Sequence, residues 1–409
     1  MKHSFPKNKI KIVLTEGIAS SATEALRQAG YSNITELAYA PDATELKTHL
    51  ETAHFLGVRS RTLVNADVLS KAPKLIGIGC FCIGTNNIDL ATARLKGIPV
   101  FNAPFSNTRS VAELTLASII LLLRDLPTKY YASKNNLWLK TAKGAHEVRG
   151  KSLGIVGYGN IGSQVSILAD FLGMQIRYYD IVNKLSHGNA TAVSSLEELY
   201  KKSDIITYHV PSTTHTKNMV RAETIKKMKS GVKIINFSRG NVVNLDDLAT
   251  ALKDGSVSGA AVDVYPEEPE NNDKPFHTPL HDLDNVLLTP HIAGSTEEAQ
   301  TKIGNEVADK FIMYSDNGST VGVVNFPEVS LPTHVKSHRI INIHLNKPGL
   351  LAKINKVFYS NKANVVGQFL QTKDEIGYVV TDVEYDRNVL NYVEDIKKIK
   401  GSIKTRLLH

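Results

Sequence analysis

Residues 151–163, KSLGIVGYGNIGS, place a short apolar run directly before three glycines with the spacing Gly157-x-Gly159-x-x-Gly162. A helical pattern, SQVSILADFLG, begins at the end of this stretch, so the glycines join a predicted strand to a predicted helix. In that context Gly157 makes a tight turn, Gly159 lets the backbone approach a pyrophosphate, and Gly162 lets helix and strand pack closely. The N–H groups at the helix start would face the phosphates. The stretch therefore predicts a dinucleotide-binding unit.

The next predicted strand, QIRYYD, ends in Asp180. A carboxylate about 20 residues beyond the first glycine accepts hydrogen bonds from the adenosine ribose and repels a 2′-phosphate, which favours NAD over NADP. We therefore predict that the NAD site includes these motif residues: Gly157, Gly159, Asn160, Ile161, Gly162 and Asp180.

Apolar runs alternate with helical patterns through the first three-quarters of the chain. Before the glycine motif, the predicted strands are Ile10–Leu14, His54–Val58, Leu75–Ile78 and Pro99–Phe101. From the motif onward they are Leu153–Val156, Ile176–Tyr179, Ile205–His209, Lys233–Phe237, Gly259–Val264 and Val286–Thr289. A long helical pattern near Val111 separates the two series. Such alternation predicts an α/β protein with two doubly wound, Rossmann-like lobes built on parallel sheets.

The alternation of predicted strands and helices ends at residues 324–338, VNFPEVSLPTHVKSH. These residues hold two prolines and no helical period and are typical of a linker. The remaining pattern is strand, helix, strand, strand, helix, strand, namely Arg339–His344, Pro348–Ser360, Val365–Gln371, Tyr378–Val383, Asn388–Ile399 and Ile403–Leu408. This βαββαβ order predicts a small ferredoxin-like domain at the C-terminus. A helix with a Ser295-x-x-Glu298 capping box is predicted before the linker.

Composition narrows the function classes. Of 409 residues, 42% are hydrophobic and 22% charged, which is typical of a soluble globular enzyme. Lys and Arg exceed Asp and Glu by 48 to 40, but no dense basic block indicates nucleic-acid binding. The most apolar stretch, 114–123, is too short to span a membrane, and no signal peptide is evident. We therefore expect a cytoplasmic protein that binds neither nucleic acid nor membrane.

The sequence has two cysteines, Cys80 and Cys82. Two cysteines exclude a disulfide framework, and a single C-x-C without a second pair is a poor zinc site. We therefore predict no metal site and interpret both cysteines as small packing residues.

Polar side chains follow three predicted strands beyond the glycine motif. Arg239 follows KIINF, Glu268 lies in the loop DVYPEEP, and His291 follows NVLLTP. Because ligands of doubly wound sheets lie beyond the carboxyl ends of the strands, these side chains are expected to meet. Taken singly, Arg239 could cap a helix, Glu268 could be a charge on a loop, and His291 could only pack against its neighbours. Together they fit oxidation of a 2-hydroxy acid: Arg239 for the carboxylate, His291 as acid and base, and Glu268 to orient the imidazole.

These motifs, with GVRSRT (57–62), KLIGIGCFCIGTNNIDL (74–90) and GIPVFNAPFSNTRSVAEL (97–114), resemble the D-isomer-specific 2-hydroxyacid dehydrogenases. Within that family they are similar to the bacterial type of D-3-phosphoglycerate dehydrogenases with a single C-terminal ACT domain. The resemblance covers essentially the whole chain. It implies a substrate-binding domain (1–105 and 295–325), an NAD-binding domain (106–294), a linker (326–338) and an ACT regulatory domain (339–409).

The resemblance also implies the reaction: NAD-dependent oxidation of 3-phospho-D-glycerate to 3-phosphohydroxypyruvate, the first step of L-serine biosynthesis, with 2-oxoglutarate reduction as a side activity. It assigns the catalytic residues as Arg239, Glu268 and His291. It adds to the cofactor site Phe237, Ser238, Arg239, Asp263, His291, Ile292, Ala293 and Gly294. It assigns the substrate phosphate and carboxylate contacts to Arg59, Ser60, Arg61, Ile83, Gly84 and Lys140.

In the C-terminal domain, INIHLNKPGLL (341–351) ends a predicted strand and opens a helix, where backbone amides could hold a small anion. The resemblance implies feedback inhibition by L-serine, bound by His344, Asn346 and Asn364 of paired ACT domains, and a homotetramer.

Three alternatives stay open at this point. The first is a D-2-hydroxyacid dehydrogenase for an unphosphorylated substrate such as glycerate or lactate, which the cations Arg59, Arg61 and Lys140 disfavour. The second is a dinucleotide-sensing binding protein that keeps the catalytic residues. The third is a serine-binding regulator without catalysis, which the complete set of Arg239, Glu268 and His291 disfavours.

Overall fold

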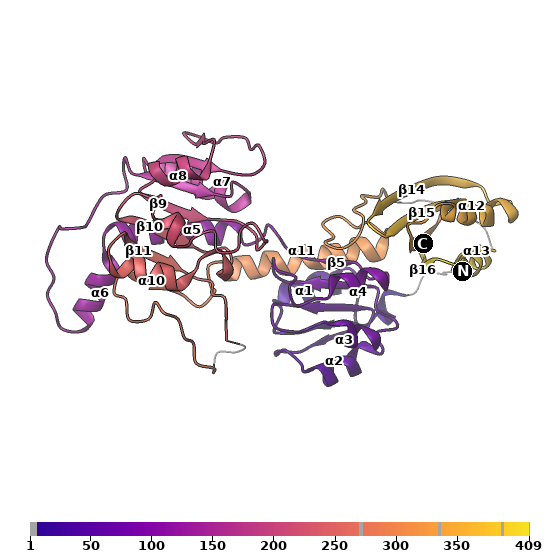
Figure 1. The fold of residues 1–409 in the computed structure, drawn as a ribbon. Helices are drawn as coiled ribbons and strands as arrows, with labels where there is room; N and C mark the ends of the chain where they lie inside the picture. The colour runs from indigo at the N-terminus through magenta and orange to yellow at the C-terminus, as the bar shows by residue number, and fades with distance from the viewer. Residues whose placement is uncertain (1–5, 270–272, 334–336, 386–387, 409) are drawn as a thin grey trace. The chain divides into compact units, whose positions relative to one another are not determined.

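The computed structural model describes residues 6–269, 273–333, 337–385 and 388–408. The chain divides into two compact units, residues 1–106 with 300–409, and residues 107–299. They contain two parallel sheets and one antiparallel sheet, each flanked by helices (Figure 1). The predicted fold class, two doubly wound lobes and a ferredoxin-like domain, is therefore confirmed.

The first sheet, in the discontinuous unit, has the strand order β2-β1-β3-β4-β5, with every pair parallel. Its strands are β1 (Ile12–Leu14), β2 (Ile34–Glu36), β3 (Phe55–Val58), β4 (Gly77–Cys80) and β5 (Val100–Phe101). Its helices are α1 (Ser20–Gln28), α2 (Ala43–Leu50), α3 (Ala66–Ser70) and α4 (Leu90–Leu95). The central strands are buried along their whole length because helices cover both faces, which accounts for their continuous apolar runs.

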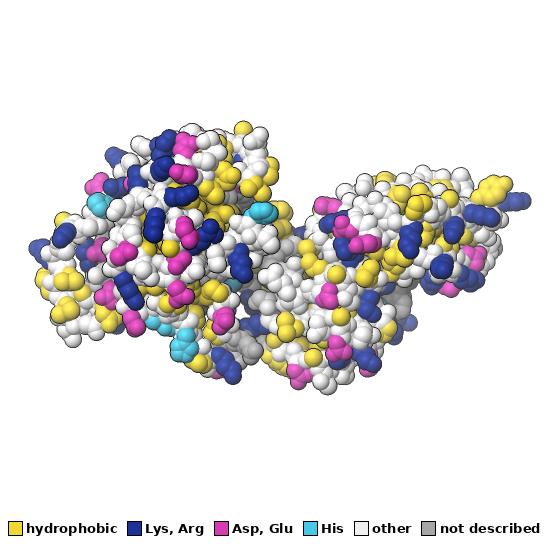
Figure 2. Space-filling model, viewed as in Figure 1, with side chains coloured by type: hydrophobic (Ala, Val, Ile, Leu, Met, Phe, Trp, Pro, Cys, Tyr) yellow, Lys and Arg dark blue, Asp and Glu magenta, His cyan; other side chains and the backbone are white. Residues whose placement is uncertain are grey.

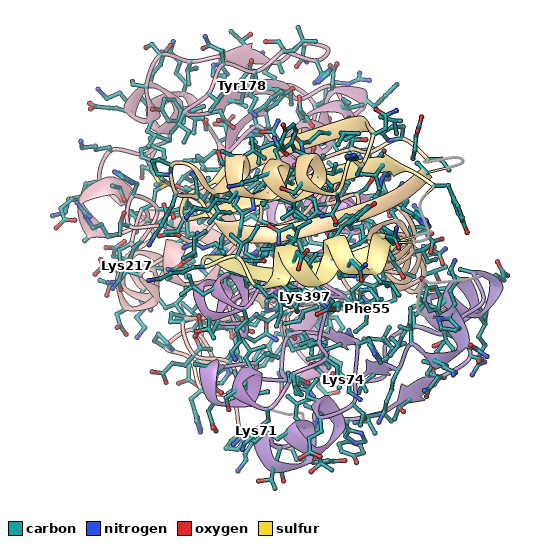
Figure 3. The ribbon with its side chains drawn as sticks, turned by 90° about the vertical axis from the view of Figure 1, so that its right-hand side faces the viewer. Phe55, Lys71, Lys74, Tyr178, Lys217 and Lys397 are labelled. Carbon is teal, nitrogen blue, oxygen red and sulfur yellow. The ribbon has the colours of Figure 1, made fainter. Side chains whose placement is uncertain are left out.

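The long helix α11 (Glu297–Asp316) supplies aromatic packing to this first sheet. The ring of Phe311 lies 4.5 Å from that of Phe55 on β3 and also packs against Phe81 and Phe101. Phe55 is fully buried inside the lobe, whereas Lys71 and Lys74 lie at its surface (Figure 3). Buried rings of this size add a large apolar area to the packing of α11 on the sheet.

The second unit holds a seven-stranded parallel sheet with the order β12-β11-β10-β9-β6-β7-β8. Its strands are β6 (Ser152–Val156), β7 (Gln175–Tyr179), β8 (Thr191–Ala192), β9 (Ile205–Tyr208), β10 (Val232–Asn236), β11 (Val257–Val262) and β12 (Val286–Leu288). Its helices are α5 (Thr108–Leu123), α6 (Leu126–Lys134), α7 (Asn160–Phe171), α8 (Leu196–Lys202), α9 (Ala222–Ile225) and α10 (Leu245–Lys253). The strand order reverses between β6 and β9, and such a switch point forms a ligand crevice in doubly wound sheets.

The C-terminal sheet is antiparallel, with the order β14-β15-β13-β16. It consists of β13 (Ser337–Leu345), β14 (Val365–Lys373), β15 (Ile376–Glu384) and β16 (Ser402–Leu408), with α12 (Leu350–Ser360) and α13 (Val389–Lys397). Both helices pack in one cluster with Ile340, Val379 and Val383. Alternate residues such as Ile341 and Tyr378 share a different cluster with Phe311 and Tyr314 of α11. Strands β13 and β15 are thus buried on both faces, whereas β14 at the edge of the sheet is mostly exposed.

Several details differ from the predictions. The strand predicted at Leu75–Ile78 is β4 at Gly77–Cys80, and the short strands β2 and β8 had no prediction. The Thr296 hydroxyl, not that of Ser295, accepts the backbone N–H of Ala299 at the start of α11. Within the predicted linker, the side chains of Phe326, Val329 and Leu331 are buried in the core of the first lobe. Residues 334–336 of that predicted linker lie outside the described residues.

Basic and acidic side chains are interspersed on the face shown in Figure 2. Among the described residues, no helix combines the length and apolar character needed to cross a membrane. In the same part of the chain, His, Cys, Asp and Glu side chains form no group of three or more that could hold a metal ion.

Candidate active site

The glycine motif joins β6 to α7 as a turn whose three glycines meet different surroundings. Gly157 has a φ of 89°, and a Cβ there would collide with the His209 carbonyl. A Cβ on Gly162 would collide with the carbonyl of Gly157. A Cβ on Gly159 would meet no atom within 4 Å. The fold therefore requires glycine at positions 157 and 162. Gly159 instead leaves open space at the N-terminus of α7, where a pyrophosphate would fit.

Asp180 follows β7 and is tied to the glycine turn. One carboxylate oxygen accepts the Tyr158 N–H at 2.8 Å, and the other accepts the Val182 N–H at 3.0 Å. The side chain remains partly exposed, so lone pairs can still accept ribose hydroxyls. Asn160 is exposed and Ile161 half-buried in the first turn of α7. These residues fit NAD: an open turn, a helix N-terminus and a carboxylate at the end of the second strand.

Arg239 lies three residues beyond β10, on a loop held by hydrogen bonds at its base. The Asn236 side chain donates to the Arg239 carbonyl at 2.9 Å and accepts the Ser238 hydroxyl at 2.8 Å. The Arg239 guanidinium donates to the Ser238 carbonyl at 2.7 Å. A Cβ on Gly240 would collide with the backbone of Tyr265, so glycine allows the loop after β10 to approach the loop after β11. Phe237 and Ser238 are buried beneath it.

His291 and Glu268 form a hydrogen-bonded pair. Nδ1 of His291 lies 2.7 Å from Oε2 of Glu268, and Oε1 of Glu268 accepts the Tyr265 N–H at 3.1 Å. The Nδ1–H group of His291 thus donates a hydrogen bond to the carboxylate, so Nε2 carries the lone pair when the ring is neutral. About half of the His291 side chain (53%) is exposed, which leaves Nε2 accessible to a substrate.

The pair shifts both pKa values. The hydrogen bond that His291 donates to Glu268 raises the pKa of His291 above its usual value, although burial and the Arg239 charge oppose the increase. Burial raises the pKa of Glu268, but the hydrogen bond and charge of His291, the Tyr265 N–H and the Arg239 charge lower it to below the usual value. The pair is therefore an imidazole of increased basicity beside a carboxylate that stays ionised, which suits general acid–base catalysis.

Asp263, directly after β11, shapes the His291 loop. Its buried carboxylate accepts the Thr289 hydroxyl at 2.7 Å and the backbone N–H groups of Ile292 and Ala293 at 2.8 Å each. Burial raises the pKa of Asp263 despite these bonds. All of these bonds go to protein groups, so the carboxylate positions the loop. The neighbouring candidates differ in burial: Ile292 is exposed, Ala293 is buried and Gly294 is intermediate.

In the other unit, Arg59, Ser60 and Arg61 lie on the loop that follows β3, and Glu16 holds this loop. Oε1 of Glu16 accepts the N–H groups of Arg59 at 3.0 Å and Thr62 at 2.8 Å, and Oε2 accepts the N–H of Arg61 at 3.0 Å. Glu16 itself has a φ of 60°, which is uncommon for a residue with a side chain. The carboxylate orders the backbone from which the predicted phosphate contacts project.

Ile83 and Gly84 follow β4 in the same unit and are half-buried. The Asn102 side chain donates to the Ile83 carbonyl at 2.7 Å. A little further on, the Asn87 side chain donates to the carbonyls of Arg59 at 3.0 Å and Thr62 at 2.7 Å. Because β3 and β4 pair in parallel, the loops that follow them are neighbours, and these two loops carry all of the predicted substrate residues of this unit. Lys140 belongs to the other unit, where it is exposed.

The predicted effector residues lie at the end of β13 and directly before β14 in the C-terminal domain. His344 on β13 is buried, its Nδ1 lies 3.1 Å from the Asn342 side-chain oxygen, and burial lowers the pKa of His344. A Cβ on Gly377 would collide with its ring. Asn346 is exposed and donates to the Asp374 carbonyl at 3.2 Å. Asn364, also exposed, directly precedes β14, whose side chains are mostly exposed.

Glu16 and Asn87 are the residues that sequence reasoning missed. Glu16 comes two residues after β1, so the strand-end rule that found Arg239 could have found it too. Asn87 carried no signal, because its partners Arg59 and Thr62 lie 28 and 25 residues away along the chain.

Two known domain families match this chain, one in its middle part and one near its C-terminus. The NAD binding domain of D-isomer specific 2-hydroxyacid dehydrogenases matches residues 116–293, and an AHAS small subunit-like ACT domain matches residues 340–404. The D-3-phosphoglycerate dehydrogenase of Haemophilus influenzae is 52% identical over 408 residues, covering 100% of this chain and 99% of the relative. That of Escherichia coli strain K12 is also 52% identical, over the full length of both chains. A Dictyostelium discoideum relative of the same name is 44% identical over 99% of both.

Solved structures agree with the sequence matches. The D-lactate dehydrogenase of Aquifex aeolicus, in complex with NAD and lactic acid, superposes with a TM-score of 0.66 at 29% identity over 78% of this chain and 100% of that one. The NAD-dependent formate dehydrogenase of Staphylococcus aureus, in complex with NAD, has a TM-score of 0.66 at 28% identity over 76% of this chain and 96% of that one. The chain therefore belongs to the D-3-phosphoglycerate dehydrogenases, NAD-dependent members of the D-isomer-specific 2-hydroxyacid dehydrogenase family with a C-terminal ACT domain.

Proposed function

We propose that this enzyme oxidises 3-phospho-D-glycerate to 3-phosphohydroxypyruvate with NAD, as the first step of L-serine biosynthesis. The observation that carries the proposal is the 2.7 Å pair between His291 and Glu268, which lies at the strand ends that also carry Arg239. The names of the full-length relatives support the choice of substrate.

His291 is the proposed acid and base. Glu268 holds the proton on Nδ1, so Nε2 of the neutral ring accepts the proton of the substrate's C2 hydroxyl as oxidation proceeds. In the reverse direction the protonated ring returns it. The resulting imidazolium is stabilised by the ionised Glu268 carboxylate, which also keeps the ring in one orientation.

Arg239 is the proposed anchor of the substrate's carboxylate. Its planar guanidinium can hold both carboxylate oxygens, which fixes the rotation of the substrate about C2. NAD, when bound, would supply the acceptor for the hydride of C2. The glycine turn and Asp180 would hold its phosphates and ribose, and the proposed site extends through Phe237, Ser238, Asp263, Ile292, Ala293 and Gly294.

The substrate's phosphate would be bound by Arg59, Ser60 and Arg61, with backbone groups of Ile83 and Gly84 and the ammonium of Lys140. A dianion calls for guanidinium and ammonium groups together with N–H donors. Support comes from the three hydrogen bonds by which Glu16 orders the backbone at Arg59 and Arg61. An unphosphorylated hydroxy acid would leave these cations unused, which favours the phosphorylated substrate.

The ACT domain is the proposed site of feedback control by L-serine. His344 and Asn346 lie at one end of β13, and Asn364 precedes the exposed strand β14, so the site would be completed by the ACT domain of a second chain. Such pairing belongs to the proposed homotetramer. We also propose that the enzyme acts in the cytoplasm and reduces 2-oxoglutarate slowly.

The test is NADH oxidation with 3-phosphohydroxypyruvate, with and without L-serine. We expect rapid oxidation that serine suppresses. Equal activity on hydroxypyruvate would contradict the assignment of the phosphate site, and activity indifferent to serine would contradict the ACT assignment. If 3-phosphohydroxypyruvate, hydroxypyruvate and 2-oxoglutarate were all inert, the proposed dehydrogenase reaction itself would be wrong.

A further inference from the structure

A buried ion pair on α11 lies outside the residues that the proposed reaction uses. Lys310 is 7% exposed, and its ammonium donates to Oε1 of Glu306, one helical turn earlier, at 2.8 Å. Oε2 of Glu306 accepts the Ser106 hydroxyl. A Cβ on Gly322 would lie 2.9 Å from the Lys310 ammonium, so glycine leaves the space that the ammonium occupies. Because desolvation offsets most of the attraction within a buried ion pair, stability alone does not account for this one.

The Lys310 ammonium also connects this pair to the loop that follows β4. Lys310 donates to the Asn102 backbone carbonyl at 2.6 Å, and the Asn102 side chain donates to the Ile83 carbonyl at 2.7 Å. A second bond joins the same two segments, because the Ala103 N–H donates to the Cys82 carbonyl at 3.1 Å. The loop after β4 is therefore tied to α11 through Asn102.

The bond from Asn102 orients the peptide group between Ile83 and Gly84. This peptide is trans and planar, so its carbonyl and its N–H point in opposite directions. Because the carbonyl points at the Asn102 amide, the Gly84 N–H points away from it. A Cβ on Gly84 would meet no atom within 4 Å, so open space borders this residue. Within the described part of the chain, no group accepts the Gly84 N–H, which is therefore available to an anion.

We propose that Lys310 and Asn102 are positioning residues that aim the Gly84 N–H at an anionic oxygen of the substrate. Lys310 holds the backbone of Asn102, and Asn102 holds the Ile83 carbonyl, so neither side chain is required to touch the substrate. The proposal rests on the proposed function, which places Ile83 and Gly84 at the substrate's phosphate or carboxylate. A donor that is oriented before the substrate arrives adds affinity, because binding then requires no further ordering of the loop.

The first experiment measures kcat and KM for 3-phosphohydroxypyruvate, and KM for NADH, in the full-length enzyme. Asn102→Ala removes the donor to the Ile83 carbonyl. The loss of one neutral hydrogen bond should raise the KM for 3-phosphohydroxypyruvate about five- to tenfold. The KM for NADH should stay constant, because the glycine turn belongs to the other unit.

A double variant separates positioning from stability. Lys310→Met keeps the apolar stem and removes the ammonium, and Glu306→Gln avoids a buried unpaired charge while it can still accept the Ser106 hydroxyl. Because such a replacement of a buried ion pair is often neutral, the melting temperature should stay near that of the wild type. The KM for 3-phosphohydroxypyruvate should nevertheless rise as in Asn102→Ala. Adding Asn102→Ala to the double variant should raise this KM no further, because Lys310 acts through Asn102.

Lys7→Met is the matched control on the same helix. The Lys7 ammonium likewise donates to a backbone carbonyl, that of Ala29, and to a carboxylate of α11, that of Asp316. These partners lie outside the loop after β4. Lys7→Met should therefore leave the KM for 3-phosphohydroxypyruvate and the KM for NADH unchanged.

Alkylation of Cys82 by iodoacetamide tests the order of the loop without a substrate. Cys82 is partly exposed and donates to the Gly84 carbonyl, whereas the other cysteine, Cys80, is fully buried. A loop that has lost its anchor opens more often, so Asn102→Ala and the double variant should react severalfold faster than the wild type. Lys7→Met should react at the rate of the wild type.

An unchanged KM for 3-phosphohydroxypyruvate in Asn102→Ala would overturn the proposal. Equal rises in both KM values with a lower melting temperature would overturn it as well, because they indicate a structural role only. A wild type inactive on 3-phosphohydroxypyruvate would instead contradict the proposed function. Alkylation would then decide alone whether Lys310 and Asn102 hold the loop, and rates equal to that of the wild type would show that they do not.

Discussion

His291 has a backbone conformation that its neighbours must hold. Its φ of 54° lies in the left-handed region, which costs a non-glycine residue about 1 kcal/mol or more. Asp263 offsets that cost by accepting the N–H groups of the next two residues, Ile292 and Ala293, while Glu268 fixes the ring. The proposed acid and base is thus held by two carboxylates with separate tasks, one for the backbone and one for the imidazole.

Replacing Glu268 with glutamine tests the second task. Glu268→Gln keeps a hydrogen-bond acceptor but removes the charge that raises the pKa of His291, so that pKa should fall. Reduction of 3-phosphohydroxypyruvate requires the protonated ring, so its rate falls as the pH rises, and in the variant this fall should occur at lower pH. Oxidation requires the neutral ring, so its rate falls as the pH drops, and in the variant this fall should also occur at lower pH. Rate profiles against pH in both directions check this, and an unmoved profile would contradict the assignment.

Glu16 can be tested at the same scale. Glu16→Gln replaces one of the two acceptor oxygens by an NH₂ group, so at least one of the three backbone N–H groups at Arg59, Arg61 and Thr62 loses its acceptor. Hydrogen bonds to a charged group contribute about 1.5–3 kcal/mol, so we expect the KM for 3-phosphohydroxypyruvate to rise about tenfold. Glu16→Ala, which loses all three bonds, should raise it further. The KM for NADH should stay constant, and equal rises in both KM values would indicate general damage instead.

The strand-end rule explains which residues could be predicted. Arg239 and His291 follow apolar runs within a few residues, so their places at the sheet edge depend on local pattern alone. Their geometry could not be predicted, because the left-handed turn at His291 depends on Asp263, nearly thirty residues earlier in the chain. Glu16 also follows a strand end, but its role depends on three hydrogen bonds that reach 43 to 46 residues along the chain, which local pattern does not show.

Among the elements, the turn between β6 and α7 offers a direct test of cofactor binding. A Cβ on Gly159 meets no protein atom within 4 Å, so Gly159→Ala should leave the melting temperature nearly unchanged. The methyl group would occupy the space proposed for the pyrophosphate, so NADH binding should weaken by about tenfold or more, as expected when a close backbone approach is blocked. Gly162→Ala is the matched contrast, because its Cβ meets the Gly157 carbonyl and should lower the melting temperature. Calorimetry and NADH titration distinguish the two, and unchanged NADH affinity in Gly159→Ala would contradict the site.

Asp180 tests cofactor choice on the neighbouring strand end. Asp180→Ala removes the carboxylate that repels a 2′-phosphate, so the ratio of NADH to NADPH affinity should fall by about tenfold. NADH itself should bind more weakly, because the Tyr158 N–H also loses its acceptor. Fluorescence titration with both nucleotides measures the ratio. A ratio equal to that of the wild type would show that another group selects the cofactor.

Element boundaries were less predictable than element types. The apolar run at Leu75 and Ile76 suggested an early start to β4, yet pairing with β3 begins only at Gly77, opposite Phe55. The segment 326–333 has the prolines of a linker, but its apolar residues are buried in the core of the first lobe. Both differences come from packing between distant segments, which period and turn residues do not encode.

For the whole molecule, the groups that the proposed reaction uses are divided between the two units. The pair of His291 and Glu268, Arg239 and the glycine turn belong to residues 107–299, whereas Arg59 and Arg61 belong to the other unit. The ACT domain belongs to that other unit as well, and its sheet shares one apolar cluster with α11. An effector on the ACT domain would therefore act on the lobe that holds the proposed phosphate contacts.

Truncation tests this shared cluster. A chain ending at Thr333 loses the Tyr378 hydroxyl bond to the Gly318 carbonyl and the bonds from the Arg339 guanidinium to the carbonyls of Asn317 and Pro332, and it exposes apolar surface on α11. Because 1 kcal/mol shifts the melting temperature of a domain this size by about 2–4 °C, the first lobe should melt at least about 5 °C lower. The full-length variant Tyr378→Phe removes one hydroxyl bond and should cause a smaller shift. NADH affinity should be retained in both, because the glycine turn belongs to the other unit. Calorimetry that finds the truncated lobe melting with the full chain would show that the ACT domain is an independent attachment.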